Sequence, residues 1–351
     1  MLGWVRRAVF VVVAISAVAI VCGFLYEQLS RHDVASEHPP PGQLVDVGGH
    51  RLHLNCTGSG SPTVILEHGT GLTGSLSFVL VQPEIAKSHR VCSYDRAGIM
   101  WSEGGRKKSS VALFVDDLHS LLTNASESPP YIMVGYSFGG LLVREYTSRY
   151  PLEVQAMVLV ESVHPEQNER FASVTGSEPY QYPRWTNLKE RVLAEIGATR
   201  LFDSSELDDV PDEAMISKEF QSYSTVALQR ELMSSYKYSL GAKEMSSLGD
   251  LPLLVLRGEW AFTSATPQEL AEMTPEEIRT QEEEARIWRE LNREWFEMQE
   301  ELAALSTNSE VRVVEGAQHR ISYEAPDAVV RAVNDVAEQI LIAAQGAEPI
   351  A

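Results

Sequence analysis

The sequence lacks the short motifs by which proteins usually hold a metal ion or a nucleotide phosphate. It contains no H-E-x-x-H, no paired C-x-x-C and no Walker A pattern, and those spacings are what gather ligands around a zinc ion or a phosphate. Positive charge is also scarce, because 29 Lys and Arg stand against 49 Asp and Glu, for a formal net charge of -20. Nucleic-acid binding needs a basic patch. We therefore predict no cofactor, no metal and no nucleic-acid partner.

Cysteine is equally scarce, with three residues in the chain. Cys22 lies in an apolar run, where it behaves as a small hydrophobic side chain. Cys56 and Cys92 fall at the ends of predicted strands. They could form a disulfide if the protein is exported, and they could equally remain two buried thiols. The sequence leaves both interpretations open.

A long apolar run stands near the N-terminus. Residues 8–26 carry no charge and follow Arg6 and Arg7, and about 20 apolar residues suffice to span a bilayer. The alternative is a cleaved signal peptide, because Ala17-Val18-Ala19 resembles a cleavage site. The run continues past that point, which favours an uncleaved single-pass anchor with residues 1–7 in the cytoplasm. The positive-inside rule then places the rest of the protein on the extracytoplasmic side.

A polar spacer that contains three consecutive prolines, residues 27–42, follows the apolar run. Beyond it, continuous apolar strand patterns alternate with helical patterns. This alternation indicates a mostly parallel sheet with helices on both faces. The expected strands are 43–47, 51–56, 63–67, 90–94, 131–136, 155–161, 251–256 and 311–314.

Two helical insertions interrupt this pattern. Residues 162–250 are expected to form a helical lid, and 259–306 a second insertion, within a core made of 43–161 and 251–344 and followed by a flexible tail at 345–351. In the second insertion, Thr274-Pro275-Glu276-Glu277 combines an N-cap, a first-turn proline and a capping glutamate. An apolar stripe at helical spacing follows it: Trp288, Leu291, Trp295, Met298, Leu302 and Leu305. We expect this stripe to pack on the core, with a substrate pocket or a partner helix as the alternative.

Gly135-Tyr136-Ser137-Phe138-Gly139 is a G-x-S-x-G sequence. The pattern alone is weak, since chance supplies it in about one chain in ten of this length. Here an apolar strand runs into it and a helix runs out of it. A serine on such a tight strand-to-helix turn projects its hydroxyl above the sheet. Ser137 is therefore the predicted nucleophile.

A serine hydroxyl needs a base before it can attack. Among nine histidines, His319 is best placed, because it follows the last predicted strand and precedes the last helix. His164, in the loop after the sixth strand, is a competitor. His68 precedes a glycine turn, and we expect it to shape that loop instead of taking a proton.

Together these pieces resemble the α/β-hydrolase superfamily, over about residues 43–344, and its cap-bearing esterase and lipase-like members most. The resemblance implies an eight-stranded α/β-hydrolase sheet, the chain order nucleophile, acid, histidine, and a lid after the sixth strand. It also implies an oxyanion hole from the backbone N–H of Phe138 and one near Thr70. The matching pieces are Leu66-Glu67-His68-Gly69, Tyr94-Asp95-Arg96-Ala97-Gly98, the Ser137 turn, Val158-Leu159-Val160-Glu161 and His319.

The chain departs from the family pattern at the acid. Most members place an aspartate shortly after the seventh strand, where this chain reads Gly258-Glu259-Trp260-Ala261-Phe262. Some lipases carry the acid after the sixth strand, where this chain has Glu161. A carboxylate is required to hold the histidine tautomer. Glu161 is the first choice and Glu259 the second. A further departure, Ile99-Met100, replaces a small residue and a glycine.

A dinucleotide site is a remote alternative. Gly69-Thr70-Gly71-Leu72-Thr73-Gly74 matches G-x-G-x-x-G after a strand, and Asp95 follows about 20 residues later, as such a site requires. However, Pro83 falls where the crossover helix should run, and proline breaks helix interiors. A loop that brings backbone amides to an oxyanion explains these glycines better than an NAD-dependent oxidoreductase does.

The prediction is thus a serine hydrolase that cleaves a small apolar carboxylic ester through an acyl-enzyme. Apolar specificity is expected from the membrane and from the lid aromatics Tyr180, Tyr182 and Trp185, although these could be packing residues. The rival class is a non-catalytic relative acting as a membrane-tethered binding protein, a hypothesis favoured by Ala261 in place of the expected acid. The sequence points to no particular protein partner.

Overall fold

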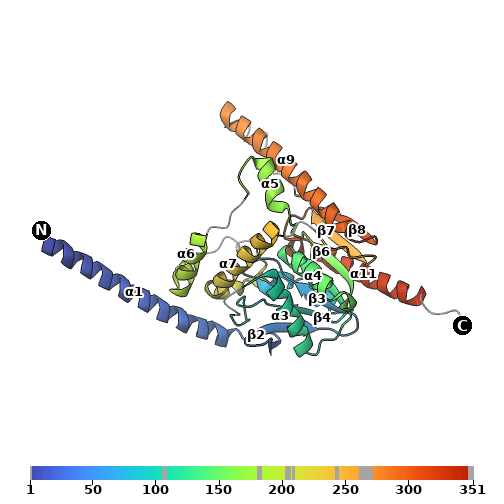
Figure 1. Ribbon diagram of the computed structural model, residues 1–351, viewed down its shortest axis with the longest axis horizontal. Coiled ribbons are helices and arrows are strands. Elements are labelled where there is room, and N and C mark those ends of the chain that lie inside the picture. Colours follow the sequence, from blue (N-terminus) through green and yellow to red (C-terminus); the bar gives the residue numbers. More distant parts are fainter. Residues whose placement is uncertain are drawn as a thin grey trace.

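The computed structural model describes residues 2–104, 109–179, 184–201, 207, 210–241, 245–260 and 272–346. Its centre is an eight-stranded sheet in the order β1-β2-β4-β3-β5-β6-β7-β8 (Figure 1). β2 pairs antiparallel with β1 and β4, and the remaining pairs are parallel. The predicted sheet is confirmed, with strand ends shifted by no more than two residues. The strands are β1 (Gln43–Asp46), β2 (Arg51–Thr57), β3 (Thr63–Glu67), β4 (Val91–Tyr94), β5 (Tyr131–Tyr136), β6 (Val154–Val160), β7 (Leu253–Gly258) and β8 (Ser309–Val314).

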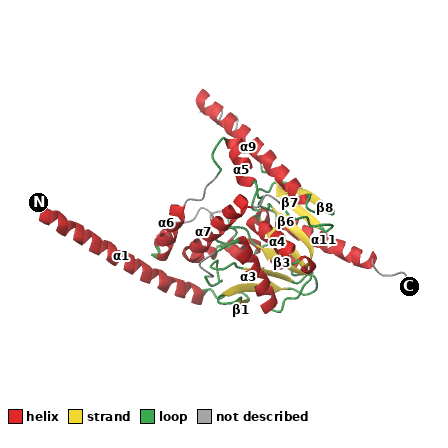
Figure 2. Ribbon diagram, viewed as in Figure 1, coloured by secondary structure: helices red, strands yellow, loops and turns green. Residues whose placement is uncertain are grey.

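Helices cover both faces of the sheet (Figure 2). Successive side chains of a strand point to opposite faces, so Ile65 joins one buried cluster and its neighbours Val64 and Leu66 join the other. Strands buried on both faces must be apolar throughout, which explains their continuous hydrophobic sequences. The first cluster contains α3 (Val111–Asn124) and α4 (Phe138–Arg149), and the second contains η1 (Gly74–Phe78), α2 (Gln82–Ile85), α10 (Ile321–Glu324) and α11 (Pro326–Gly346).

The secondary-structure elements described between β6 and β7 are all helices. They are α5 (Gln167–Thr175), α6 (Arg184–Glu195), η3 (Ala198–Leu201), η5 (Asp212–Ala214) and α7 (Ser217–Gly241). Tyr180 and Tyr182 lie outside the described residues, as does the side chain of Trp185. We call the described part of residues 162–250 the lid segment.

Between β7 and β8 lies α9 (Pro275–Ala303), which begins with the predicted capping box of Thr274 and Glu277. Only the C-terminal half of its apolar stripe is deeply buried, at Trp295, Met298 and Leu302. The other end of α9 projects away from the sheet (Figure 1). Core packing therefore accounts for part of the stripe, as expected.

The N-terminal helix α1 (Leu2–Glu37) is longer than the sequence led us to expect. Residues 27–37, expected to belong to the spacer, continue the helix instead. The reason is tertiary, because Glu27 is fully buried against other parts of the protein and pairs with Arg31 one turn later. Among the described residues, this helix alone is long and apolar enough to cross a membrane.

Cys56 and Cys92 form a disulfide between β2 and β4, where they are directly opposite in the strand register. This resolves the alternative that the sequence left open. Disulfides persist mainly in oxidising compartments. The bond is therefore compatible with an exported domain.

Candidate active site

Ser137 occupies the turn between β5 and α4 with φ +53 and ψ -117. A non-glycine residue with positive φ is strained and persists only where its surroundings hold it. The backbone here is held at both ends, because the N–H of Ser137 donates to Val160 and its carbonyl accepts from Gly140 and Val163. The turn also needs glycine at position 135, since a Cβ there would lie 2.6 Å from the Cα of Gly140.

His319 lies between β8 and α10 and contacts Ser137 and Glu161 at once. Its Nε2 is 3.2 Å from Ser137 Oγ, and its Nδ1 is 3.2 Å from Glu161 Oε2. The His319 side chain is 43% exposed, whereas Glu161 is fully buried. Three side chains from separate loops at the carboxyl edge of the sheet thus form one hydrogen-bonded series.

Glu161, directly after β6, has its carboxylate fixed by three donors. Oε1 accepts the backbone N–H of Gly258 at 2.6 Å, and Oε2 accepts the indole N–H of Trp260 at 3.0 Å in addition to the His319 contact. Glu259, the second choice of acid, points elsewhere and accepts the N–H of Gly316. The geometry thus brings the first-choice carboxylate, and not the second, to His319. Position 261, where the family carries its aspartate, lies outside the described residues.

Within the described residues, the other two candidate histidines make no hydrogen bond to Ser137, and each has a separate structural role. His164 accepts the N–H of Glu166 on Nδ1, and burial lowers its pKa to about 4. His68 is buried, its Nδ1 lies 2.7 Å from the carbonyl of Gly69, and burial lowers its pKa well below 6.5. His68 therefore stays neutral and shapes the loop after β3, in agreement with the sequence analysis.

The loop after β3 lies against the nucleophile. A Cβ on Gly69 would come within 3.1 Å of Ser137 Cβ. The glycines of this loop are followed by η1 and α2, of five and four residues. A dinucleotide site needs a long helix at this point. The described structure therefore disfavours that alternative.

A cluster of buried charged side chains, which the sequence analysis missed, binds the backbone of this loop. The guanidinium of Arg96 is 2.5 Å from Glu67 and 2.7 Å from Glu231 of α7. It also donates to the carbonyls of His68 and Gly69, both at 2.7 Å. The cluster therefore joins the loop, the core and the lid segment.

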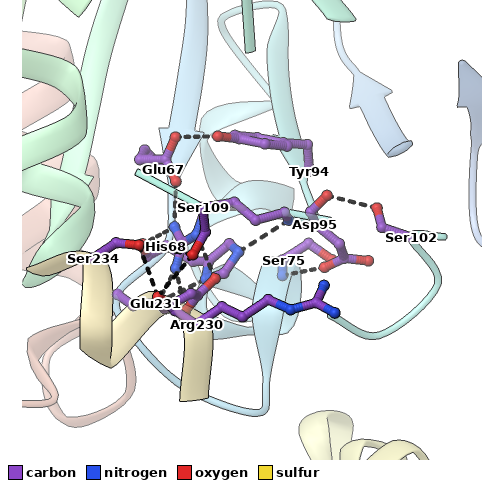
Figure 3. Close-up of polar contacts among 12 residues, drawn as sticks. Glu67, His68, Ser75, Tyr94, Asp95, Ser102, Ser109, Arg230, Glu231 and Ser234 are labelled. Atoms are coloured by element: carbon purple, nitrogen blue, oxygen red, sulfur yellow. Dashed lines mark hydrogen bonds and ion pairs between the residues drawn. The ribbon is translucent and has the colours of Figure 1, made fainter. Parts of the chain in front are cut away.

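Figure 3 shows how Glu67, Tyr94 and Glu231 converge in this cluster. Tyr94 donates its hydroxyl to Glu67, and Glu231 also accepts the N–H of Gly71. The available sequence signal was Glu67 itself, an acidic residue ending a fully apolar strand, which requires a buried cationic partner. That partner is Arg96, and Arg96 is also bound by Glu231 of α7, 135 positions further along the chain, which no local pattern reveals.

Burial raises the pKa of Glu67 to about 7 from 4.5, although Arg96 opposes the shift. Between these values the folded protein keeps a proton that the unfolded chain has lost, so Glu67 makes stability fall as pH rises. Glu67→Gln cannot titrate. We expect its stability relative to wild type to increase by a few kcal/mol between pH 4.5 and 7.

Melting temperatures of both proteins across this pH range test the expectation. Glu284→Gln, an exposed change on α9, is the control and should run parallel to wild type. If the melting temperature of Glu67→Gln also runs parallel to that of wild type across this pH range, Glu67 is ionised throughout and the prediction is wrong.

Residues 62–206 match the family model described as the alpha/beta hydrolase fold. Over 267 residues the chain is 24% identical to the protein YbdG of Bacillus subtilis, covering 72% of this chain and 79% of YbdG. It is 32% identical over 143 residues to 2-hydroxy-6-oxo-2,4-heptadienoate hydrolase of Pseudomonas putida, covering 39% of this chain and 51% of that enzyme. A vacuolar membrane protein of Saccharomyces cerevisiae is 31% identical over 134 residues, which are 33% of this chain and 21% of that protein.

Solved structures agree on the architecture. A putative lipase from Acinetobacter baumannii superposes with a TM-score of 0.57 at 17% identity, covering 89% of this chain and 97% of that one. A thermophilic esterase from Thermogutta terrifontis superposes with a TM-score of 0.54 at 19% identity, covering 85% and 98%. At such identities the likeness shows the fold and not the activity. The chain therefore has the α/β-hydrolase fold.

Proposed function

We propose that this protein is a serine hydrolase that cleaves carboxylic esters, with Ser137 as nucleophile, His319 as base and Glu161 as acid. The observation that carries the proposal is the series Ser137 Oγ, His319 and Glu161, joined by two contacts of 3.2 Å. His319 takes the hydroxyl proton while Ser137 attacks the substrate carbonyl. The tetrahedral intermediate then collapses and expels the alcohol, which takes that proton from His319. Water hydrolyses the acyl-enzyme with His319 again as base.

Glu161 serves this mechanism by fixing His319. A carboxylate on Nδ1 holds the proton there, so Nε2 is free to accept from Ser137, and it stabilises the imidazolium that forms. Gly258 and Trp260 keep the carboxylate in place by donating to it. Trp260 also lies edge-on to the His319 ring, with centroids 6.2 Å apart. Its indole therefore limits where the imidazole can move.

The oxyanion would be held by the backbone N–H groups of Phe138 and Thr70. Across a trans peptide the C=O and N–H point in opposite directions. Because Arg96 holds the carbonyl of Gly69, the N–H of Thr70 is turned away from Arg96. Each such donor contributes about 3 kcal/mol to the transition state. Arg96 and its partner Glu231 are thus positioning residues.

This role makes a prediction for the lid segment. Glu231→Gln weakens the hold on Arg96, so we expect kcat to fall by about 10²-fold, the cost of a small misplacement, with KM nearly unchanged. Affinity for a trifluoromethyl ketone, whose adduct carries an oxyanion, should fall by the same factor. Glu219→Gln in the same helix is the matched control. A lower melting temperature with unchanged kcat per titrated active site would instead assign Glu231 to stability alone.

Labelling with a fluorophosphonate tests the proposed function directly. The full chain in detergent should react at Ser137, because the hydroxyl is activated by His319. Ser137→Ala should abolish labelling, whereas Ser162→Ala, a buried serine in the same region, should leave it intact. Folded wild-type protein that does not label would favour the non-catalytic binding protein.

We further propose that α1 anchors the protein as a single-pass helix with the hydrolase domain on the extracytoplasmic side. The support is the apolar helix with Arg6 and Arg7 at its start, together with the Cys56–Cys92 disulfide. A membrane location makes apolar esters the most accessible substrates. Rates on ester series of increasing acyl length test that preference, and we expect kcat/KM to rise with chain length.

A further inference from the structure

The lid segment is fixed to α1 by close packing and a buried ion pair. At Gly23 the helix approaches so closely that a Cβ would lie 2.5 Å from the carbonyl oxygen of Ile196. One turn later Glu27, fully buried, binds Arg31 of α1 at 2.6 Å and Arg200 of η3 at 2.7 Å. A buried carboxylate with two guanidinium partners is costly to separate. The lid segment and the C-terminal part of α1 therefore form one body.

The position of this contact along α1 fixes its depth in a bilayer. Twenty residues at 1.5 Å each span about 30 Å, the thickness of the hydrocarbon core. Counted from Ala8, the first residue after Arg6 and Arg7, they end at Glu27. Gly23 is four residues, or about 6 Å, inside that limit. The part of the lid segment that touches Gly23 thus reaches the membrane interface.

The lid segment exposes apolar side chains at this place. Leu188 is 53% and Val192 49% exposed, one helical turn apart on α6, and Leu201 beside Arg200 is 79% exposed. We call these three residues the lid face. Lys189 and Arg191, both exposed, flank it, and such long cationic chains can reach lipid headgroups while their stems stay apolar. Figure 1 shows α6 beside α1, whose N-terminal half extends beyond the body.

We propose that the lid face lies in the surface of the bilayer that α1 spans, so the substrate of the hydrolase site is a long-chain acyl ester resident in that membrane. This inference rests on the proposed anchor and the proposed esterase activity. An amphipathic element at an interface buries its apolar side about 5–10 Å deep, which agrees with the depth at Gly23. The same lid segment carries Glu231, which binds Arg96 behind the site. Ester lipids therefore meet the protein at the element that borders Ser137.

Depth-dependent quenching tests the contact with the membrane. In a Cys22→Ser background, the full chain carries an environment-sensitive fluorophore at Val192→Cys or Leu201→Cys and is placed in nanodiscs containing doxyl-labelled phospholipid. Ile15→Cys, in the apolar run of α1, is the positive control. Leu152→Cys is the matched negative control, because Leu152 is 97% exposed but precedes β6, at the sheet edge opposite the lid segment. We expect clear quenching at 15, 192 and 201, and none at 152.

The outcomes separate the inference from the anchor on which it depends. Quenching at 15 but not at 192 and 201 would keep the anchor and overturn the lid-face contact. No quenching at 15 would overturn both. Equal quenching at 152 would mean general surface adsorption, which also contradicts the inference.

Activity measurements test the substrate class. The variant with Val192→Asp and Leu201→Asp loses apolar burial at the interface, so kcat/KM on a long-chain ester embedded in nanodiscs should fall at least about tenfold. The same variant should hydrolyse a water-soluble short-chain ester at the wild-type rate. The control variant Leu152→Asp should hydrolyse both esters at the wild-type rate. An equal loss on both esters would overturn the inference, whereas activity on neither ester in wild type would overturn the esterase proposal itself.

Discussion

Replacing His319 by alanine is expected to lower kcat by about 10⁶-fold, as much as Ser137→Ala does. The two side chains act as one unit, because Ser137 attacks only when His319 Nε2, 3.2 Å away, takes its proton. The double variant should therefore lose no more than either single variant. Residual hydrolysis should come from the oxyanion donors and from substrate positioning.

Turnover of an activated ester by the two single variants and the double variant measures this coupling. His164→Ala is the control, because His164 contacts Glu166 and Glu301 and should leave kcat close to wild type. Additive losses in the double variant would mean that Ser137 and His319 act independently. The proposed triad would then be wrong.

Glu161→Gln is expected to lower kcat by about 10⁴-fold, while Glu259→Gln leaves it nearly unchanged. The amide has nearly the same shape as the carboxylate, but it carries no charge and can present an N–H to His319 Nδ1, which favours the unproductive tautomer. Glu259 is the matched control, because it neighbours the site but binds the N–H of Gly316.

Activity is measured with the same ester, and circular dichroism checks that both variants fold. Glu161 also accepts the N–H of Gly258, so a folded Glu161→Gln variant is needed before its turnover is interpreted. A large loss in Glu259→Gln with little loss in Glu161→Gln would reverse the assignment of the acid.

The sequence by itself predicted the sheet and the position of Ser137, because both depend on local patterns. Strands buried on both faces require continuous apolar runs, and the turn at Ser137 requires small residues, as at Gly135. Thr274 and Glu277 predicted the start of α9 for the same reason, since a capping box forms within one turn. His319 was selected by its place in the chain order, which also depends on recognising the strands.

Only the tertiary structure decided which carboxylate faces His319. Glu161 and Glu259 follow adjacent strands, and their side-chain directions depend on backbone turns that the sequence does not reveal. Glu161 adopts φ +46, which aims its carboxylate at Gly258, Trp260 and His319. The tertiary structure also paired Cys56 with Cys92, because strand register brings together residues 36 positions apart.

Local sequence patterns also did not predict the ion-pair partners of the buried charged residues. Arg96 meets Glu231, and Glu27 meets Arg200, over separations of 135 and 173 residues. A charge is stable in a protein interior only when a partner satisfies it, and here each partner comes from the lid segment. Local patterns therefore determined the elements of this protein, whereas long-range pairing of buried charges decided how the lid segment joins the candidate site to the N-terminal helix.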